Sequence, residues 1–570
     1  MDHGRRISSR KSPTRKNIER GRKSQNPTKT KNTHTGTPRT SSSRSTRKSS
    51  KRALLAYVVA IIAICYKWIT PNGVSSAIAQ IKQILPYEFQ STNQRKINEF
   101  LRWLKQNDAV ISERLNIAEF REYGGFGLKA VEGKRGGISI KATDELFTIP
   151  AHLITSAESV YQQMEKIHPN LPQQFRQKLE KHISSDLVQQ DVMIAIHLIA
   201  ECSMGKNSKF QPYLDIIPQE IVPRLDTFGG DDYMILNDAF LTSVGKESQH
   251  TLMRFWNDDD LQKLLVDYVG YRKRQEGARI TRQNAACIDF SSFHRFVSIV
   301  SSRAMILSDQ KFLTPLSGMI NYEPRPLEKI VTDTEHPFHL FHQKNLGGSI
   351  TVRADRNVLG GQQIFEDYGD LDNSLYLEAF GFVPDENPFH CANIIGKHLP
   401  QPSELASKGL AKTMIRLGML PPSRDAWNSY VPDLCARVDG SIDDNNAVRY
   451  LTISALSSSP KSLEKCINSL TINSTTLNCL HYPGKDEMNK KTVRNLARRM
   501  YCDQKNSLEH DLALLNSLQS GSGTQGKTSI QRVLALKFSI AEKRTLSQLG
   551  GIGHSECAVY DEAVASLKSS

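Results

Sequence analysis

Four short segments carry side chains whose types and positions could serve chemistry. Asn321 ends the apolar run FLTPLSGMIN, and a buried amide there needs partners for both its oxygen and its nitrogen. SSR at 301–303 places a guanidinium after two hydroxyls. GGFG at 124–127 is a glycine-rich turn, and Tyr368 stands directly before Gly369. Taken one at a time, these patterns are also typical of a turn, a helix end on solvent or a strand cap.

Several common site patterns do not apply to this chain. It contains no H-E-x-x-H metal-binding helix and no G-x-S-x-G nucleophile elbow. The turn at 124–127 lacks the strand–helix context and the third glycine of a dinucleotide site. The nine cysteines form no C-x-x-C pair and do not cluster with histidine at zinc-ligand spacing. The sequence therefore predicts no metal, and the odd, scattered cysteines predict reduced, buried thiols rather than a disulfide framework.

The excess positive charge of the chain lies in its first 52 residues. The whole chain has a net charge of +15, and residues 1–52 hold 17 of its basic groups but only 2 acidic ones. The other 518 residues hold 57 basic and 57 acidic groups, so the folded body is balanced. Nucleic-acid binding by that body is therefore not predicted. The tail is too poor in apolar residues to fold, and we expect it to be disordered.

An apolar segment at 53–70 follows the basic tail. At about 1.5 Å per residue, its 14 uncharged residues are short for a bilayer core of roughly 30 Å unless Lys67 extends to the interface. We favour a single-pass membrane anchor, with a cytosolic N-terminus and the body on the other side. The alternatives are a cleaved signal, with AIAQ at 77–80 as the cleavage site, a plastid or mitochondrial targeting sequence, and a helix packed on the following domain. The tail itself has two interpretations, a salt-dependent tether to an anionic membrane or nucleic acid and a solvated targeting segment.

The elements that must position the four segments begin near residue 96. INEFLRWLKQ has apolar residues at the spacing of an amphipathic helix. YGGFGLKAVEG predicts a turn that enters a strand, and DELFTIP predicts a strand that ends at Pro150. Residues 155–290 have a mostly helical pattern, and a second helical region runs from about 395 almost to the end. Between them are three short β-like runs, at 311–322, 347–355 and 362–369.

In this order the motifs resemble those of SET-domain protein methyltransferases. The segments on which the resemblance rests are FLRWL, GGFGLKA, DELFTIP, FHRFVSIVSSRAMI, FLTPLSGMINY, QQIFEDYG and DNSLYLEAFGFV. The resemblance is to the branch that includes plant Rubisco large-subunit lysine methyltransferase and actin-histidine methyltransferase. SLEHDLALLNS and SIQRVLALKFSIAEKRTL are similar to its helical substrate-binding domain. The resemblance implies an α+β fold: a β-rich SET domain over 96–390 with a helical insert at about 155–290, an all-α domain over 395–550, and a tail at 551–570.

The resemblance also implies an activity. Methyl transfer from S-adenosylmethionine to a protein side chain needs a narrow channel and a deprotonated acceptor, most simply a lysine amine, although histidine stays open. Tyr368 is the implied catalytic residue, and Arg303 would pair with the carboxylate of the cofactor. The implied cofactor-binding residues are Gly125, Phe126, Gly127, Glu145, Leu146, Phe147, Arg303, Asn321, Tyr322, Tyr368 and Phe382. The implied substrate-pocket residues are Ser302, Met305, Gly318 and Phe380.

Three positions depart from the pattern of the family. Tyr322 stands where the family has His, Gly318 where it has Asp, and Phe380 where it has Tyr. Because removing one preorganised group can cost on the order of a hundredfold in rate, a catalytically silent SET-like protein-binding module is the alternative function. A large ring at 322 and a small residue at 318 also suggest a compensating exchange of volume, which requires both positions to face the same space.

Overall fold

The computed structural model describes nine stretches of the chain. These are residues 92–120, 125–132, 137–275, 287–323, 340–394, 435–442, 485–504, 506–519 and 529–557. The basic tail 1–52, the apolar segment 53–70 and most of the region between 395 and 484 lie outside them. No helix in these stretches combines the length and the apolar character needed to cross a bilayer. The anchor predicted at 53–70 lies outside these stretches and stays a prediction.

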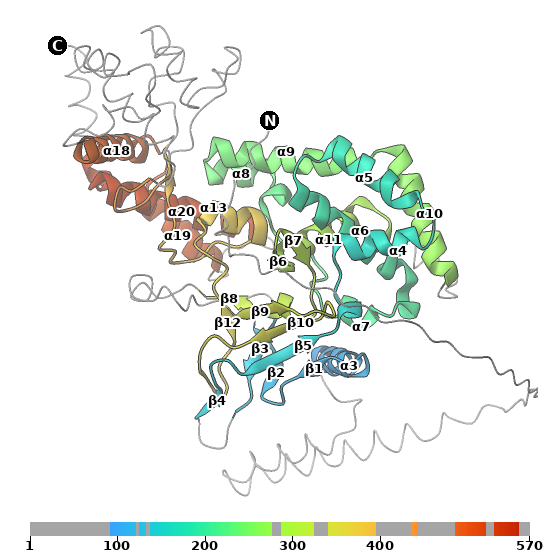
Figure 1. The fold of residues 1–570 in the computed structure, drawn as a ribbon. Helices are drawn as coiled ribbons and strands as arrows, with labels where there is room; N and C mark the ends of the chain where they lie inside the picture. Colours follow the sequence, from blue (N-terminus) through green and yellow to red (C-terminus); the bar gives the residue numbers. More distant parts are fainter. Residues whose placement is uncertain are drawn as a thin grey trace, which may run out of the picture. The chain divides into compact units, whose positions relative to one another are not determined.

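A four-stranded antiparallel sheet unites two distant parts of the chain. Its strand order is β1-β5-β10-β9. The strands are β1 Val110–Ile111, β5 Glu145–Ile149, β10 Ile350–Arg353 and β9 Phe341–Lys344. Phe147 of β5 lies opposite Ile111 on one side and opposite Val352 on the other. Figure 1 shows β1 and β5 beside the later strands, although the helical region separates them in sequence.

The remaining strands form two-stranded ladders. The pairs are β2 Leu115–Phe120 with β3 Gly125–Ala130, β4 Ile138–Ile140 with β11 Val358–Leu359, β6 Met305–Leu307 with β7 Gln310–Phe312, β8 Asn321–Tyr322 with β12 Phe365–Glu366, and β13 Ala392–Asn393 with β14 Cys435–Ala436. Within the described stretches only β8 and β12 run parallel, with Asn321 opposite Phe365. A parallel pair requires a long crossover, and here it contains β9, β10 and β11. The crossover brings Asn321 next to the segment that carries Tyr368.

Helices fill the sequence between β5 and β6. They are α4 Ala157–Glu165, α5 Leu171–His182, α6 Asp186–Met204, α7 Gln211–Leu214, α8 Gly230–Leu236, α9 Ala239–Trp256, α10 Asp259–Gln275 and α11 Phe290–Arg303. Most of α6 is buried, and it packs against α4, α10 and α11. Asp289 caps α11 by accepting a hydrogen bond from the backbone of Ser292. Where the structure describes residues 155–290, they are mostly helical as predicted, while the proposed limits of the insert stay a prediction.

Short helical elements connect these parts. The amphipathic pattern before β1 forms α3 Thr92–Gln106, with Phe100 and Leu104 fully buried. The 3-10 turns are η3 Ala151–Leu153, η4 Gly205–Asn207, η5 Leu225–Thr227, η7 Ser317–Met319 and η12 His554–Glu556. After β12 come α13 Asn373–Leu375 and the π-type turn η8 Tyr376–Phe380.

Three helices close the chain, namely α18 Lys485–Cys502, α19 Leu508–Gln519 and α20 Ile530–Gly550. A buried ion pair between Lys543 and Asp511 joins α20 to α19, and Ser539 Oγ donates to the same carboxylate at 3.0 Å. Phe538 of α20 also packs in one apolar cluster with Leu377 and Tyr233. The last helix therefore lies against both α8 and the segment that follows Tyr368.

Three disulfides contradict the prediction of reduced thiols. Cys202 is bonded to Cys287, Cys391 to Cys435, and Cys502 to Cys557, with Cα–Cα distances of 6.0, 5.2 and 5.3 Å. The partners are 85, 44 and 55 residues apart in sequence. The prediction is wrong because sequence spacing does not report which distant segments the fold brings together.

Candidate functional site

Gly127 of β3 allows two amide side chains to approach the backbone. A Cβ atom at this position would lie 2.7 Å from Asn321 Nδ2, 2.7 Å from Gln363 Nε2 and 2.8 Å from a ring carbon of Phe120. These distances are shorter than any ordinary contact, so only glycine fits. A Cβ at Gly125 would meet nothing within 4 Å. Of the two predicted glycines, packing therefore requires only Gly127.

The two amide nitrogens over Gly127 are buried donors without an acceptor. Neither Asn321 Nδ2 nor Gln363 Nε2 has a hydrogen-bond partner in the described part of the protein. An unsatisfied buried donor costs about 1–3 kcal/mol, and native proteins keep few of them. Two that converge on one spot indicate a place for a ligand with acceptor atoms. Sequence reasoning missed Gln363, although it lies in the quoted QQIFEDYG segment.

Arg303 lies at the C-terminal end of α11, next to the glycine at 318. Its Nη1 donates to the Gly318 carbonyl, and its buried Nε has no partner among the described residues. Burial lowers the pKa of the guanidinium, while the nearby Tyr213 and Tyr368 act to raise it. A Cβ at Gly318 would lie 3.1 Å from the Cβ of Arg303. The absence of a side chain at Gly318 therefore gives room for the arginine.

Tyr368 is held by a hydrogen bond at one end and by ring contacts along its face. Its hydroxyl donates to the Ile320 carbonyl at 2.6 Å. Its ring lies 4.9 Å from that of Phe380 and 5.5 Å from that of Tyr322, measured between centroids. Burial raises the pKa of the phenol well above its ordinary value of 10.0. The hydroxyl therefore stays protonated at physiological pH and acts as a positioned donor.

Tyr368 belongs to an aromatic cluster of five rings, formed by Tyr322, Tyr368, Tyr376, Phe380 and Phe382. Centroid distances within it run from 4.8 Å for Tyr322–Tyr376 to 6.2 Å for Phe380–Phe382. The Tyr376 hydroxyl donates to the Gly369 carbonyl at 2.9 Å. It also shares a side-chain hydrogen bond with Tyr322. Burial raises the pKa of Tyr322 to about 12. The cluster therefore contains three neutral hydroxyls. Phe380 has none, but the tyrosines around it supply hydroxyl groups.

The proposed exchange of volume between positions 318 and 322 is wrong. The side of Gly318 that a Cβ would occupy faces Arg303. The ring of Tyr322 instead faces Tyr376 and Phe382, at 4.8 and 5.3 Å. The two positions border different spaces, so a large ring at one cannot compensate for a small residue at the other.

The other predicted residues lie in the surrounding framework. Leu146 and Phe147 are fully buried in the sheet. Glu145 accepts a hydrogen bond from Thr148 Oγ1 at 2.7 Å and lies 3.9 Å from Arg353 of β10. Ser302 donates back to its own helix, Met305 lies opposite Phe312 in the β6–β7 hairpin, and Phe126 lies opposite Glu119 in the β2–β3 ladder. These contacts position backbone around the site and give the named side chains no shared contact with Asn321 and Gln363.

One glycine-rich segment outside the site matches known phosphate-binding patterns. GSGTQGKT at 521–528 fits both the phosphate-loop and the dinucleotide glycine spacing. Both motifs require a preceding strand, whereas α19 ends just before this segment. The segment itself lies outside the described residues, and the match carries no assignment.

The donor pair and the aromatic cluster meet at strand β8. Consecutive residues of a strand point to opposite faces, and Asn321 and Tyr322 are consecutive. Asn321 faces Gly127 and Gln363, while Tyr322 faces the rings of the cluster. Tyr368, whose hydroxyl is bonded to the neighbouring Ile320 carbonyl, stands beside both. The strand therefore carries buried amide donors on one face and packed aromatic rings on the other.

Comparison with known proteins gives a match in structure but not in sequence. No protein-family model matches the chain, and no curated protein matches it. The chain is similar to the SET domain of LSMT bound to lysine and AdoHcy, with a TM-score of 0.52, 16% identity and coverage of 82% of this chain and 92% of the other. Rubisco LSMT bound to AdoMet gives a TM-score of 0.51 at 16% identity, with coverage of 81% and 93%. The mixed helix and strand architecture predicted from sequence is thus confirmed, and the chain has the fold of these SET-domain structures.

Proposed function

We propose that this protein is an S-adenosylmethionine-dependent protein methyltransferase that acts on lysine of a non-histone protein. The observation that carries the proposal is the pair of unpartnered amides of Asn321 and Gln363 over Gly127. Asn321 belongs to β8, and the other face of β8 carries the aromatic cluster. The solved structures with this fold give support, because AdoMet, AdoHcy, lysine and monomethyllysine are among the molecules bound in them. At 16% identity they support the chemistry without fixing the substrate.

The residues present fit the amino-acid end of this cofactor. Asn321 Nδ2 and Gln363 Nε2 offer two buried donors for a carboxylate, and Arg303 Nε offers a third from α11. Charge-assisted hydrogen bonds to a carboxylate are roughly twice as strong as neutral ones. Such bonds would offset the free-energy cost of burying these three donors. When bound, the cofactor would supply an electrophilic methyl group on a sulfonium sulfur.

The aromatic cluster suits the acceptor. A lysine side chain that packs against the rings of Tyr322, Tyr368 and Phe380 leaves water, and this burial lowers the pKa of its ammonium. The ring faces attract the remaining cationic form and hold it during entry. Tyr368, fixed by its bond to Ile320, orients the neutral amine toward the Asn321 face of β8. Histidine is a second acceptor of suitable size, and the methylated residue has to be identified directly.

A silent protein-binding module is the second candidate function. The Arg303 Nη1 atom is already occupied by the Gly318 carbonyl, and Tyr322 replaces the histidine that the family resemblance implies. Both features would reduce turnover while leaving the aromatic cluster able to hold a side chain. Calorimetry with S-adenosylmethionine separates the candidates, because an intact site gives micromolar binding, about −8 kcal/mol, and a silent one gives no heat.

The direct test is transfer of label by the full-length protein. Purified protein is incubated with methyl-labelled S-adenosylmethionine and a native lysate, and labelled proteins are digested to identify the modified residue. We expect transfer to lysine that Tyr368→Phe reduces at least about a hundredfold. Tyr268→Phe is the matched control, because the Tyr268 hydroxyl in α10 is also buried but has no hydrogen-bond partner among the described residues. Absence of transfer, or equal loss in both variants, would refute the proposal.

A further inference from the structure

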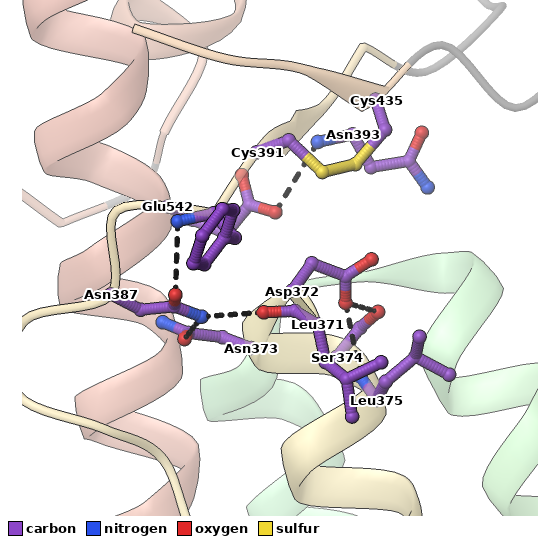
Figure 2. Close-up of a disulfide and its surroundings, with 11 residues drawn as sticks. Leu371, Asp372, Asn373, Ser374, Leu375, Asn387, Cys391, Asn393, Cys435 and Glu542 are labelled. Atoms are coloured by element: carbon purple, nitrogen blue, oxygen red, sulfur yellow. Dashed lines mark hydrogen bonds between the residues drawn. A yellow bond between two sulfur atoms is a disulfide. The ribbon is translucent and has the colours of Figure 1, made fainter. Parts of the chain in front are cut away.

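Of the three disulfides in the described stretches, one lies beside a third side chain of metal-binding type. Cys391 precedes β13 and Cys435 begins β14, so the pairing of these strands brings the two sulfurs together. One ligand atom from each of Asp372, Cys391 and Cys435 lies within 4.8 Å of the other two (Figure 2). Within the described stretches no other group of His, Cys, Asp or Glu side chains converges in this way. The other two disulfides therefore lack a third ligand there.

The Asp372 carboxylate is held in place by the start of α13. The backbone nitrogen of Leu375 donates to Oδ1 at 3.0 Å, and Ser374 Oγ donates to the same atom. Both bonds end on Oδ1, which leaves Oδ2 for another partner. A side chain that caps a helix has little freedom, so it can serve as a ligand without a further loss of entropy. Asn387 fixes the same turn by donating to the Leu371 carbonyl at 2.9 Å.

A second carboxylate approaches from the C-terminal helices. Glu542 of α20 accepts a hydrogen bond from the backbone nitrogen of Asn393 at 3.3 Å, two residues after Cys391. Figure 2 shows its carboxylate beside Cys391. No lysine or arginine in the described part of the chain forms an ion pair with Asp372 or Glu542. The buried His390 also interacts with Asp372, so two carboxylates, two sulfurs and an imidazole lie together where a divalent cation could be stabilised.

We propose that the reduced protein binds a zinc ion through Cys391, Cys435 and Asp372, at the position where the oxidised protein has a disulfide. Thiolate sulfur and carboxylate oxygen are both zinc ligands, and a tetrahedral site leaves a fourth position for water. Cysteine spacing in the sequence predicts no metal because the ligands come from three separate segments. The fold alone brings them together.

The two states differ by a balanced redox step. A dithiol such as reduced thioredoxin or dithiothreitol supplies two electrons and two protons, which break the S–S bond and give two thiols, while the dithiol becomes a disulfide. Zinc binding then displaces the two thiol protons to solvent, since only thiolates are ligands. The disulfide and the zinc site are therefore mutually exclusive.

Either crosslink holds the same parts of the molecule. It joins β13 to β14, and β13 packs against α20, whose Phe538 lies in the apolar cluster with Leu377. Zinc would keep this junction closed in a reducing compartment, where the disulfide is lost. The site is independent of methyl transfer, and its test does not use enzyme activity.

The experiment measures metal in the full-length protein before and after reduction. Protein reduced with dithiothreitol is exchanged into reductant-free buffer without oxygen, loaded with Zn²⁺ or Co²⁺, and freed of excess metal. We expect about one equivalent of bound zinc, and a thiolate-to-cobalt charge-transfer band with Co²⁺. Unreduced protein should bind neither. Absence of the metal or of the charge-transfer band from the reduced protein would overturn the proposal.

Variants locate the site. Cys391→Ser should abolish the bound zinc, and Asp372→Asn, which retains the helix cap, should weaken binding roughly tenfold or more. Cys502→Ser, at a disulfide without a third ligand, should retain it. If Cys391→Ser does not fold, alkylation of reduced wild-type protein decides: Zn²⁺ should protect Cys391 and Cys435 but not Cys502. Zinc that survives in Cys391→Ser, or equal alkylation of all three cysteines, would refute the assignment.

Discussion

The substitution Gly127→Ala tests the central contact of the candidate site. The new Cβ would lie 2.7 Å from each of the Asn321 and Gln363 amide nitrogens, whereas ordinary contact begins at 3.4 Å. Both amides would have to retreat by roughly 0.7 Å, and the Phe120 ring by nearly as much. Inserting one methyl group into a packed site costs about 1–3 kcal/mol. Because every 1.4 kcal/mol is tenfold in affinity, we expect S-adenosylmethionine binding to weaken by about tenfold or more.

Two measurements check this prediction. Calorimetry gives the dissociation constant for S-adenosylmethionine, and urea denaturation gives the change in the free energy of unfolding. Gly125→Ala is the matched control for stability, because it lies on the same strand and its Cβ would meet nothing within 4 Å. Its free energy of unfolding should stay within about 0.5 kcal/mol of wild type. Wild-type affinity and stability in Gly127→Ala would refute the close approach of the two amides and the site built on it.

Three further outcomes follow from particular contacts. Gly318→Ala places a Cβ 3.1 Å from the Cβ of Arg303, so calorimetry should show weaker S-adenosylmethionine binding, but by less than Gly127→Ala. Lys311→Met leaves Asp191 buried without its ion-pair partner at 2.6 Å and should cost about 3–5 kcal/mol in urea denaturation, and Asp191→Leu in the same protein should restore most of it. Tyr322 has a folded pKa of about 12 against 10.0 in model compounds, so its contribution to stability is complete below pH 10 and is lost as the pH rises from 10 to 12. In a titration followed by tyrosinate absorbance, Tyr322→Phe should lack one tyrosine that titrates near pH 12 in the wild type. If the tyrosine missing from the variant titrates near pH 10 instead, the burial of Tyr322 is contradicted.

Much of the local structure was predictable because it depends on neighbouring residues. The helical spacing of INEFLRWLKQ forms α3, DELFTI forms β5 and ends at Pro150, and SIQRVLALKFSIAEKRTL lies within α20 except for its first residue. Period, caps and proline act over a few residues, so they can be read without the fold.

The convergence of the site was not predictable from spacing in the same way. Asn321 and Tyr368 stand out from their motifs, whereas Gln363 does not, because a glutamine two residues before a short strand has no distinctive pattern. Its importance arises from the approach of β3, which is distant in sequence and comes within contact only because Gly127 has no side chain. The volume exchange between Gly318 and Tyr322 failed for a related reason, since their positions in the sequence do not say which space each one faces.

The sequence by itself determined the balanced charge of the folded body, the order of motifs that resembles SET-domain proteins, and several elements such as α3, β5 and α20. Only the tertiary structure decided which cysteines pair, which amides lack partners and which rings surround Tyr368. The physical reason is that propensity and periodicity are local, whereas disulfides, buried donors and ring contacts depend on distances between segments far apart in the chain. Asp372, Cys391 and Cys435 show this most directly, because no spacing in the sequence relates the three residues that the fold places within 4.8 Å of one another.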